Sequence, residues 1–133
     1  MWQADNPDCK RPTMAMMRHT AVHERAEDWM VPVEAAQRQL SQFENLFKNL
    51  GDVTDGFPKG IPLAELGNRD EYNAKMLHEN LMFGTPDQVI EKLHAYQALG
   101  VDEFIYYASM GLGLAEQKRS LELFCNEVMP AFA

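Results

Sequence analysis

Short apolar runs and helix-forming segments alternate along the second half of this 133-residue chain, and their order limits the folds that the chain can adopt. Residues 81–83 are apolar, and residues 104–107, Phe-Ile-Tyr-Tyr, are of the aromatic and β-branched types enriched in strands. A helical pattern lies between them at 86–99, and another ends at Pro130. Strands separated by helices favour parallel pairing with right-handed crossovers. The sequence therefore predicts an α/β fold.

The start of the helix at 86–99 is the clearest local signal. Gly84 allows a tight turn, Thr85 can cap the helix, Pro86 suits its first position, and Gln88 completes a Thr-x-x-Gln capping box. A helix start after such a glycine can also hold a phosphate through its N–H groups. However, Pro86 has no N–H, and Asp87 would repel an anion. The structural cap is the favoured interpretation.

Three segments carry apolar residues at intervals of three and four, the spacing of a helix with one buried face. The first has Pro32 in its expected first turn and Gly51 just past its expected end. The predicted buried positions are Val33, Ala36, Leu40, Phe43, Phe47 and Leu50 in the first helix, Val89, Leu93, Tyr96 and Leu99 in the second, and Leu121, Phe124, Cys125, Val128 and Met129 in the third. Gly100 is expected to end the second helix.

A further strand is expected at residues 13–23. Its continuous apolar run at 14–17 is typical of a strand that is covered on both faces of a parallel sheet. Arg18 and His19 are adjacent and point to opposite faces, so we expect only one of them, His19, to line a pocket. His19 and His23 lie on the same side of the strand, but no third ligand is near in sequence, and we predict no metal site.

Two segments lack a regular pattern. Residues 1–12 are polar and flanked by proline, which predicts an irregular N-terminal arm, and residues 13–133 are expected to form a single domain. Within that domain, glycines and prolines interrupt residues 51–80, with a helix expected from Asp70 to about His78. A connection of this length is usually functional or mobile. It can be interpreted as a lid-like insertion or as a solvated linker with a short helix.

Three motifs occur here in the order found in one protein family. They are Gly84-Thr85-Pro86 opening a helix, Gly100-Val-Asp leading into an aromatic strand, and a final helix ending in Phe-x-x-Glu-Val-Met-Pro130. From about Thr13 onward, the chain resembles the C-terminal segment of the bacterial luciferase-like, flavin-dependent monooxygenases. A complete (β/α)8 TIM barrel needs at least ~200 residues. The resemblance therefore implies a partial barrel of about three C-terminal βα units, with residues 51–80 as the lid.

The same resemblance implies FMN or a related flavin as the cofactor, bound at the carboxyl ends of the barrel strands. The family's flavin phosphate contacts and its principal catalytic histidine come mostly from earlier strands, so no catalytic or cofactor-binding residue can be assigned in this chain. Ser109 and Met110 follow the strand at 104–107 and, with His19, are the pocket candidates. The lone Gly-x-Gly at 111–113 is too short for a dinucleotide fingerprint.

Two functions are consistent with this sequence. The first is the C-terminal portion of a flavin-dependent monooxygenase or oxidoreductase, inactive as an isolated chain and able to take a small-molecule substrate only in a complete barrel. The alternative is a non-catalytic module of the same origin that associates with itself. A partial barrel leaves open strand edges and an uncovered inner face, which predict a homo-oligomer, most simply a dimer.

Charge and cysteine content exclude other classes. The net charge is −8, with 12 Lys and Arg against 20 Asp and Glu, so we expect binding neither to nucleic acid nor to an anionic membrane. The N-terminus lacks the basic and apolar regions of a signal peptide, and no segment is long enough to cross a membrane, which predicts a cytoplasmic protein. Cys9 is expected to be exposed and Cys125 to be a small buried hydrophobic residue.

Overall fold

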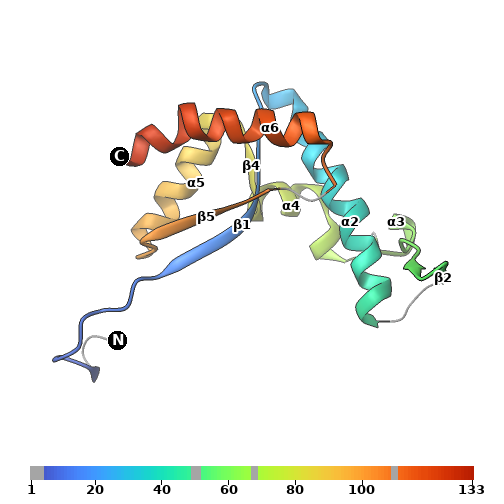
Figure 1. Ribbon diagram of the computed structural model, residues 1–133, viewed down its shortest axis with the longest axis horizontal. Coiled ribbons are helices and arrows are strands. Elements are labelled where there is room, and N and C mark those ends of the chain that lie inside the picture. The colour runs from blue at the N-terminus through green and yellow to red at the C-terminus, as the bar shows by residue number, and fades with distance from the viewer. Residues whose placement is uncertain (1–4, 49–51, 67–68, 109–110) are drawn as a thin grey trace.

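The computed structural model describes residues 5–48, 52–66, 69–108 and 111–133 (Figure 1). The principal strands are β1 (Ala15–Val22), β4 (Met82–Gly84) and β5 (Glu103–Ala108), and β2 (Val53–Thr54) and β3 (Phe57–Pro58) form a small hairpin. The α-helices are α2 (Met30–Lys48), α3 (Leu63–Leu66), α4 (Ala74–Asn80), α5 (Pro86–Ala98) and α6 (Leu114–Leu123). Shorter helical turns are η1 (Ala26–Trp29), η2 (Asp70–Tyr72), η3 (Phe124–Val128) and η4 (Met129–Phe132). In these ranges, no helix is long and apolar enough to cross a bilayer.

The three principal strands form a parallel sheet in the order β4-β1-β5. This confirms the predicted α/β class and the parallel pairing. Three consecutive strands of a barrel would instead follow one another in chain order, with β4 between β1 and β5. The observed order, in which the first strand is central, is that of an open, doubly wound sheet. The TIM-barrel arrangement is not confirmed.

Helices cover both faces of the sheet near the carboxyl end of β1. Ala21 and Phe83 face one way and pack with α2 and α4. Val22 and Met82, their immediate neighbours in sequence, face the other way and pack with α5, α6 and η3. The alternation follows from the two-residue period of a strand. Figure 1 shows α5 on one side of the strands and α2 and α4 on the other.

The amino-terminal half of β1 is not covered as predicted. Met14 and Met17 are 55% and 52% exposed, whereas Thr20, Ala21 and Val22 are buried. The apolar run forms a strand from Ala15 onward, as predicted, but α2 and α4 reach only the carboxyl end of that strand (Figure 1). Ahead of this strand, Asp102 accepts a hydrogen bond from the Met14 N–H at 2.8 Å and pairs with Arg11.

The sequence prediction is most accurate at α5. Thr85 and Gln88 form the predicted capping box, with a hydrogen bond of 3.0 Å from the Thr85 N–H to Gln88 Oε1. Val89 and Leu93 are buried. Leu99 is wrongly predicted, since it is 79% exposed. It lies just beyond the last helical residue, before Gly100 turns the chain with a φ of +92°.

The last helix buries a different face from the predicted one. Phe124 and Val128 are buried as expected, but Leu121, Cys125 and Met129 are exposed. Ser120 and Leu123 are buried instead. The ordinary α-helix ends at Leu123 and continues as a wider π-helical turn, η3, so a stripe read with one constant period gives the wrong face.

In the first helix, Val33 and Ala36 are buried as predicted, and Leu40 and Phe43 are partly buried. Leu50 and Gly51 lie outside the described residues.

The helix expected from Asp70 begins later, at Ala74. The Asn73 side chain caps it by accepting hydrogen bonds from the Lys75 and Met76 N–H groups at 3.0 and 3.2 Å.

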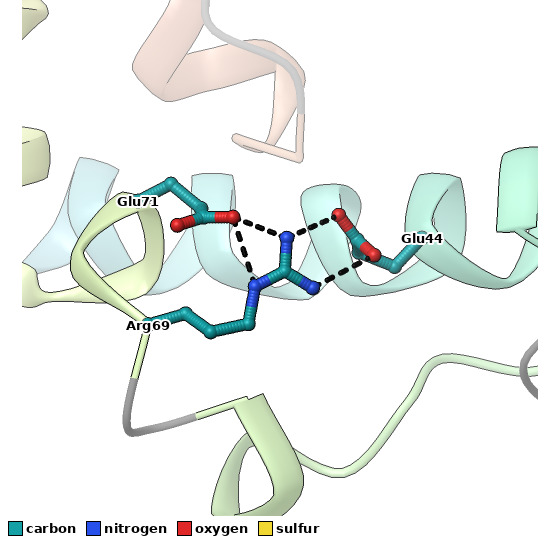
Figure 2. A network of polar contacts seen from close by, with 3 residues as sticks. All are labelled: Glu44, Arg69 and Glu71. Carbon is teal, nitrogen blue, oxygen red and sulfur yellow. Dashed lines mark hydrogen bonds and ion pairs between the residues drawn. The ribbon is translucent and has the colours of Figure 1, made fainter.

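The described part of the segment at 51–80 packs along α2. Ile61, Leu66 and Tyr72 form a small apolar cluster with Leu40. Figure 2 shows Arg69 between two carboxylates, with hydrogen bonds of 3.0 and 3.2 Å to Glu44 on α2 and of 2.8 Å to Glu71. Burial and the neighbouring Glu44 raise the pKa of Tyr72 to about 12.

Candidate functional site

In open α/β sheets, ligands bind at the carboxyl ends of the strands, where the strand order reverses. Here that point is the end of β1, because the chain next adds β4 on one side of β1 and later β5 on the other. The starts of α2 and α6 both lie near this end (Figure 1). The fold therefore directs attention to the crevice between them.

A crevice of about 340 Å³ is present at this point. This volume is at the small end of the ~300 to 1,000 Å³ range of ligand pockets. Apolar side chains and a few polar ones line it: Ala21, Val22, His23, Glu24, Asp28, Val31, Pro32, Leu112, Glu116, Arg119, Ser120 and Leu123. It combines residues from β1, from the start of α2 and from α6. The residues of β1 and α6 are almost a hundred positions apart in sequence.

Ser120 joins α6 to β1 and β5 in the wall of the crevice. Its Oγ accepts a hydrogen bond from the Val22 N–H at 2.7 Å and shares another, of 2.8 Å, with the Tyr106 hydroxyl. The pairing of β1 with β5 ends at Thr20, so Ser120 supplies the partner that β5 no longer offers to Val22. Burial raises the pKa of Tyr106. The network fixes α6 against both strands.

His23 is the ionisable group at the end of β1. Its Nδ1 lies 2.8 Å from the Arg25 carbonyl oxygen, which can only accept, so Nδ1 carries the proton and Nε2 keeps a lone pair. Nε2 is buried and has no hydrogen-bond partner. Burial lowers the pKa of His23. At neutral pH, Nε2 is therefore an unused acceptor.

His78 and Lys92 lie within electrostatic range of His23. His78 Nδ1 is also buried without a hydrogen-bond partner, and the ring contacts Trp29 edge to face. Lys92 donates hydrogen bonds to the carbonyl oxygens of His78, Leu81 and Phe83. Burial lowers the pKa of Lys92 to about 8, and the negative charge of Glu79 acts in the opposite direction. Lys92 therefore binds carbonyl groups in the last turn of α4 and just beyond it.

The crevice carries more negative than positive charge. Glu24, Asp28 and Glu116 contribute carboxylates, and Arg119 contributes a guanidinium. Arg119 is already paired, with its Nε 2.9 Å from Glu24 Oε1 and a second contact to Glu122. An anionic group entering here would meet these carboxylates before it met an available cation.

Of the three predicted pocket residues, His19 alone belongs to the described part of the chain. His19 lies halfway along β1, stacked on Tyr107 with ring centroids 4.5 Å apart, and burial lowers its pKa. It lines a different groove, of about 510 Å³, together with Arg18. Both adjacent residues line that groove, contrary to expectation, because β4 pairs only with Thr20 to Val22 and the groove follows the edge of β1 rather than one face. Ser109 and Met110 lie outside the described residues.

Glu24, Arg119 and Ser120 were missed by sequence reasoning, and His23 was considered only as a metal ligand. A signal existed for His23 alone, as the first residue after a strand. Among the described residues, no three His, Cys, Asp or Glu side chains converge as metal ligands. A larger cavity, of about 540 Å³, lies between α5, β5 and the last turns, and its mainly apolar and aromatic lining also includes Gln97, Asp102 and Glu103.

Comparison with known proteins decides the family. Over 126 residues, the chain is 32% identical to the oxygenase component of the flavin-dependent trigonelline monooxygenase of Acinetobacter baylyi. The chain is homologous to part of a flavin-dependent monooxygenase. The family predicted from the sequence motifs is thereby confirmed. The match covers 95% of this chain and 35% of the relative, so the chain spans about a third of that protein's length. No family model matches the chain, and no solved structure matches it.

Proposed function

We propose that this chain forms the C-terminal part of a luciferase-like oxygenase that uses FMN or a related flavin, and that the isolated chain does not turn over substrate. The observation that carries the proposal is the 32% identity over 95% of the chain. When bound, reduced flavin would supply the electrons that activate oxygen. The relative is named for its action on trigonelline, and a small heteroaromatic acid is the corresponding substrate class. A cytoplasmic location is part of the proposal.

The crevice does not fit the phosphate of FMN. Its cation, Arg119, is paired with Glu24 and Glu122, and three carboxylates line the walls. We therefore assign phosphate binding to parts of the complete protein that this chain does not contain. The crevice would contribute one wall of the site, where His23 Nε2 accepts a hydrogen bond or a proton from a bound group.

A chimera tests the shared function. The matching stretch of the Acinetobacter oxygenase component is replaced by this chain, and flavin-dependent oxidation of trigonelline is measured. Activity above that of the relative with the stretch deleted supports the proposal. A folded chimera that binds flavin but does not consume oxygen with the substrate contradicts it.

Two further measurements test the proposal. His23→Gln in the active chimera should lower kcat, while His94→Gln, at an exposed position on α5, serves as the matched control. The isolated 133-residue chain should show neither saturable quenching of FMN fluorescence nor NAD(P)H-dependent substrate oxidation. Robust turnover by the isolated chain would overturn the assignment of the remaining site to other segments.

A further inference from the structure

The two outer strands of the parallel sheet, β4 and β5, differ at their free edges. Each pairs with β1 on one side, and among the described residues neither pairs with another strand of this sheet on its other side. The N–H and C=O groups at such an edge can pair with an added strand. The state of each edge therefore decides where further strands can join.

Lys92 occupies the free edge of β4. The Gly84 carbonyl accepts a hydrogen bond from the His23 N–H at 3.0 Å and therefore faces β1. Successive peptide groups of a strand point to alternate sides, so the carbonyls of Leu81 and Phe83 face away from β1. Lys92 Nζ, which reaches this edge from α5, donates a hydrogen bond of 2.9 Å to each of them. The lysine thus uses the acceptors that an added strand would need.

The edge of β5 is not occupied in this way. The Glu103 N–H lies 3.2 Å from the Met14 carbonyl oxygen and therefore faces β1. By the same alternation, the peptide groups of Phe104 and Tyr106 face away from β1. β5 contains neither lysine nor proline, which commonly protect edge strands, and four of its six residues have high strand propensity. This edge is therefore competent for strand addition.

We propose that the remaining two-thirds of the complete oxygenase extends the sheet at β5 and not at β4. The identity of this partner rests on the proposed function, since the chain matches only 35% of the relative. Buried peptide groups are nearly always paired, and an added strand would pair those of Phe104 and Tyr106. The same segment would cover Met17 and Ile105 beside this edge, which are 52% and 49% exposed.

Amide hydrogen exchange tests the proposal in the isolated chain and in the chimera with the Acinetobacter oxygenase component, both isotopically labelled at phenylalanine and tyrosine. Phe104 and Tyr106 report on the β5 edge and Phe83 on the β4 edge. Tyr107, whose N–H faces β1 by the same alternation, reports general stabilisation. Relative to Tyr107, protection of Phe104 and Tyr106 should rise at least about 100-fold in the chimera, and that of Phe83 should not change. A folded chimera without this rise, or with an equal rise at Phe83, would overturn the proposal.

Exchange and activity separate this proposal from the shared function. An inactive chimera that shows the protection supports the assignment of the β5 edge and contradicts only the shared activity. An active chimera that lacks the protection contradicts the assignment of the edge alone.

A matched pair of substitutions covers a chimera that fails to fold. Phe104→Pro and Phe104→Ala both remove the ring, but only proline removes the outward N–H. In the isolated chain the two variants should unfold at similar urea concentrations, because proline is tolerated at an edge where the N–H faces solvent. When each is co-expressed with the remaining two-thirds of the relative as a separate polypeptide, the alanine variant should capture at least about tenfold more of it. Equal capture by the two variants, or no capture by the wild type, would overturn the proposal.

Discussion

Removing the Ser120 hydroxyl should destabilise the fold by more than its size suggests. Ser120→Ala deletes the acceptor of the Val22 N–H, at 2.7 Å, and the partner of the Tyr106 hydroxyl, at 2.8 Å. Val22 is only 4% exposed, so its N–H would lie buried without a partner. An unsatisfied buried donor costs about 1–3 kcal/mol, and we expect a loss of about 2 kcal/mol in the free energy of unfolding.

Tyr106→Phe is the matched perturbation. It removes one hydroxyl from the same network but leaves the hydrogen bond from Val22 to Ser120 in place, so it should cost only about 0.5–1.5 kcal/mol. In the double variant, the bond between Ser120 and Tyr106 can be lost only once. The combined cost should therefore fall short of the sum of the single costs by about 0.5–1 kcal/mol.

Urea unfolding followed by circular dichroism measures all four proteins, and unchanged m-values would show that the unfolding transition exposes the same surface in each. The reasoning predicts that Ser120→Ala costs more than Tyr106→Phe. If Tyr106→Phe costs as much as Ser120→Ala or more, the Val22 N–H does not depend on Ser120. If the two losses add fully, the hydrogen bond between Ser120 and Tyr106 does not contribute to stability.

Three further changes test other parts of the fold. Thr85→Ala should lower the free energy of unfolding by about 1 kcal/mol, because it removes the hydroxyl of the capping box, whereas Thr85→Ser should be nearly neutral. Equal losses for the two variants in urea melts would instead assign the role of Thr85 to its methyl group. Gly111→Ala should lower the free energy of unfolding by at least about 1 kcal/mol more than Gly56→Ala does. Both glycines have φ near +80°, but of these two positions only Gly111 would place a Cβ against a backbone oxygen of α2, at 2.6 Å. Equal losses in thermal melts would contradict this contact. Burial lowers the pKa of His78 in the folded state, so just below pH 6.5 the unfolded chain binds more protons, and the free energy of unfolding should decrease as the pH falls through that window. His78→Gln should flatten this pH dependence in urea melts at a series of pH values. An unchanged slope would exclude His78 as its source.

Local sequence determined the individual elements. The Thr85 and Gln88 box starts α5 because the side chains that satisfy its first N–H groups lie within one turn. The aromatic run at 104–107 became β5, and strands alternating with helices became a parallel sheet, because such signals need only a few neighbouring residues. The same motifs were sufficient to predict the flavin-dependent monooxygenase family.

Only the tertiary structure decided which surfaces are covered and which residues meet. Strand order depends on which element pairs with β1, and nothing local to β4 or β5 specifies that β1 lies between them. For the same reason, a continuous apolar run in β1 left Met17 half exposed, since no helix reaches that part of the sheet. The contacts of Ser120 with Val22 and of Arg119 with Glu24 span more than ninety residues. Periodicity reports the face of one element but not its neighbour, so the crevice at the end of β1 could be found only in the folded chain.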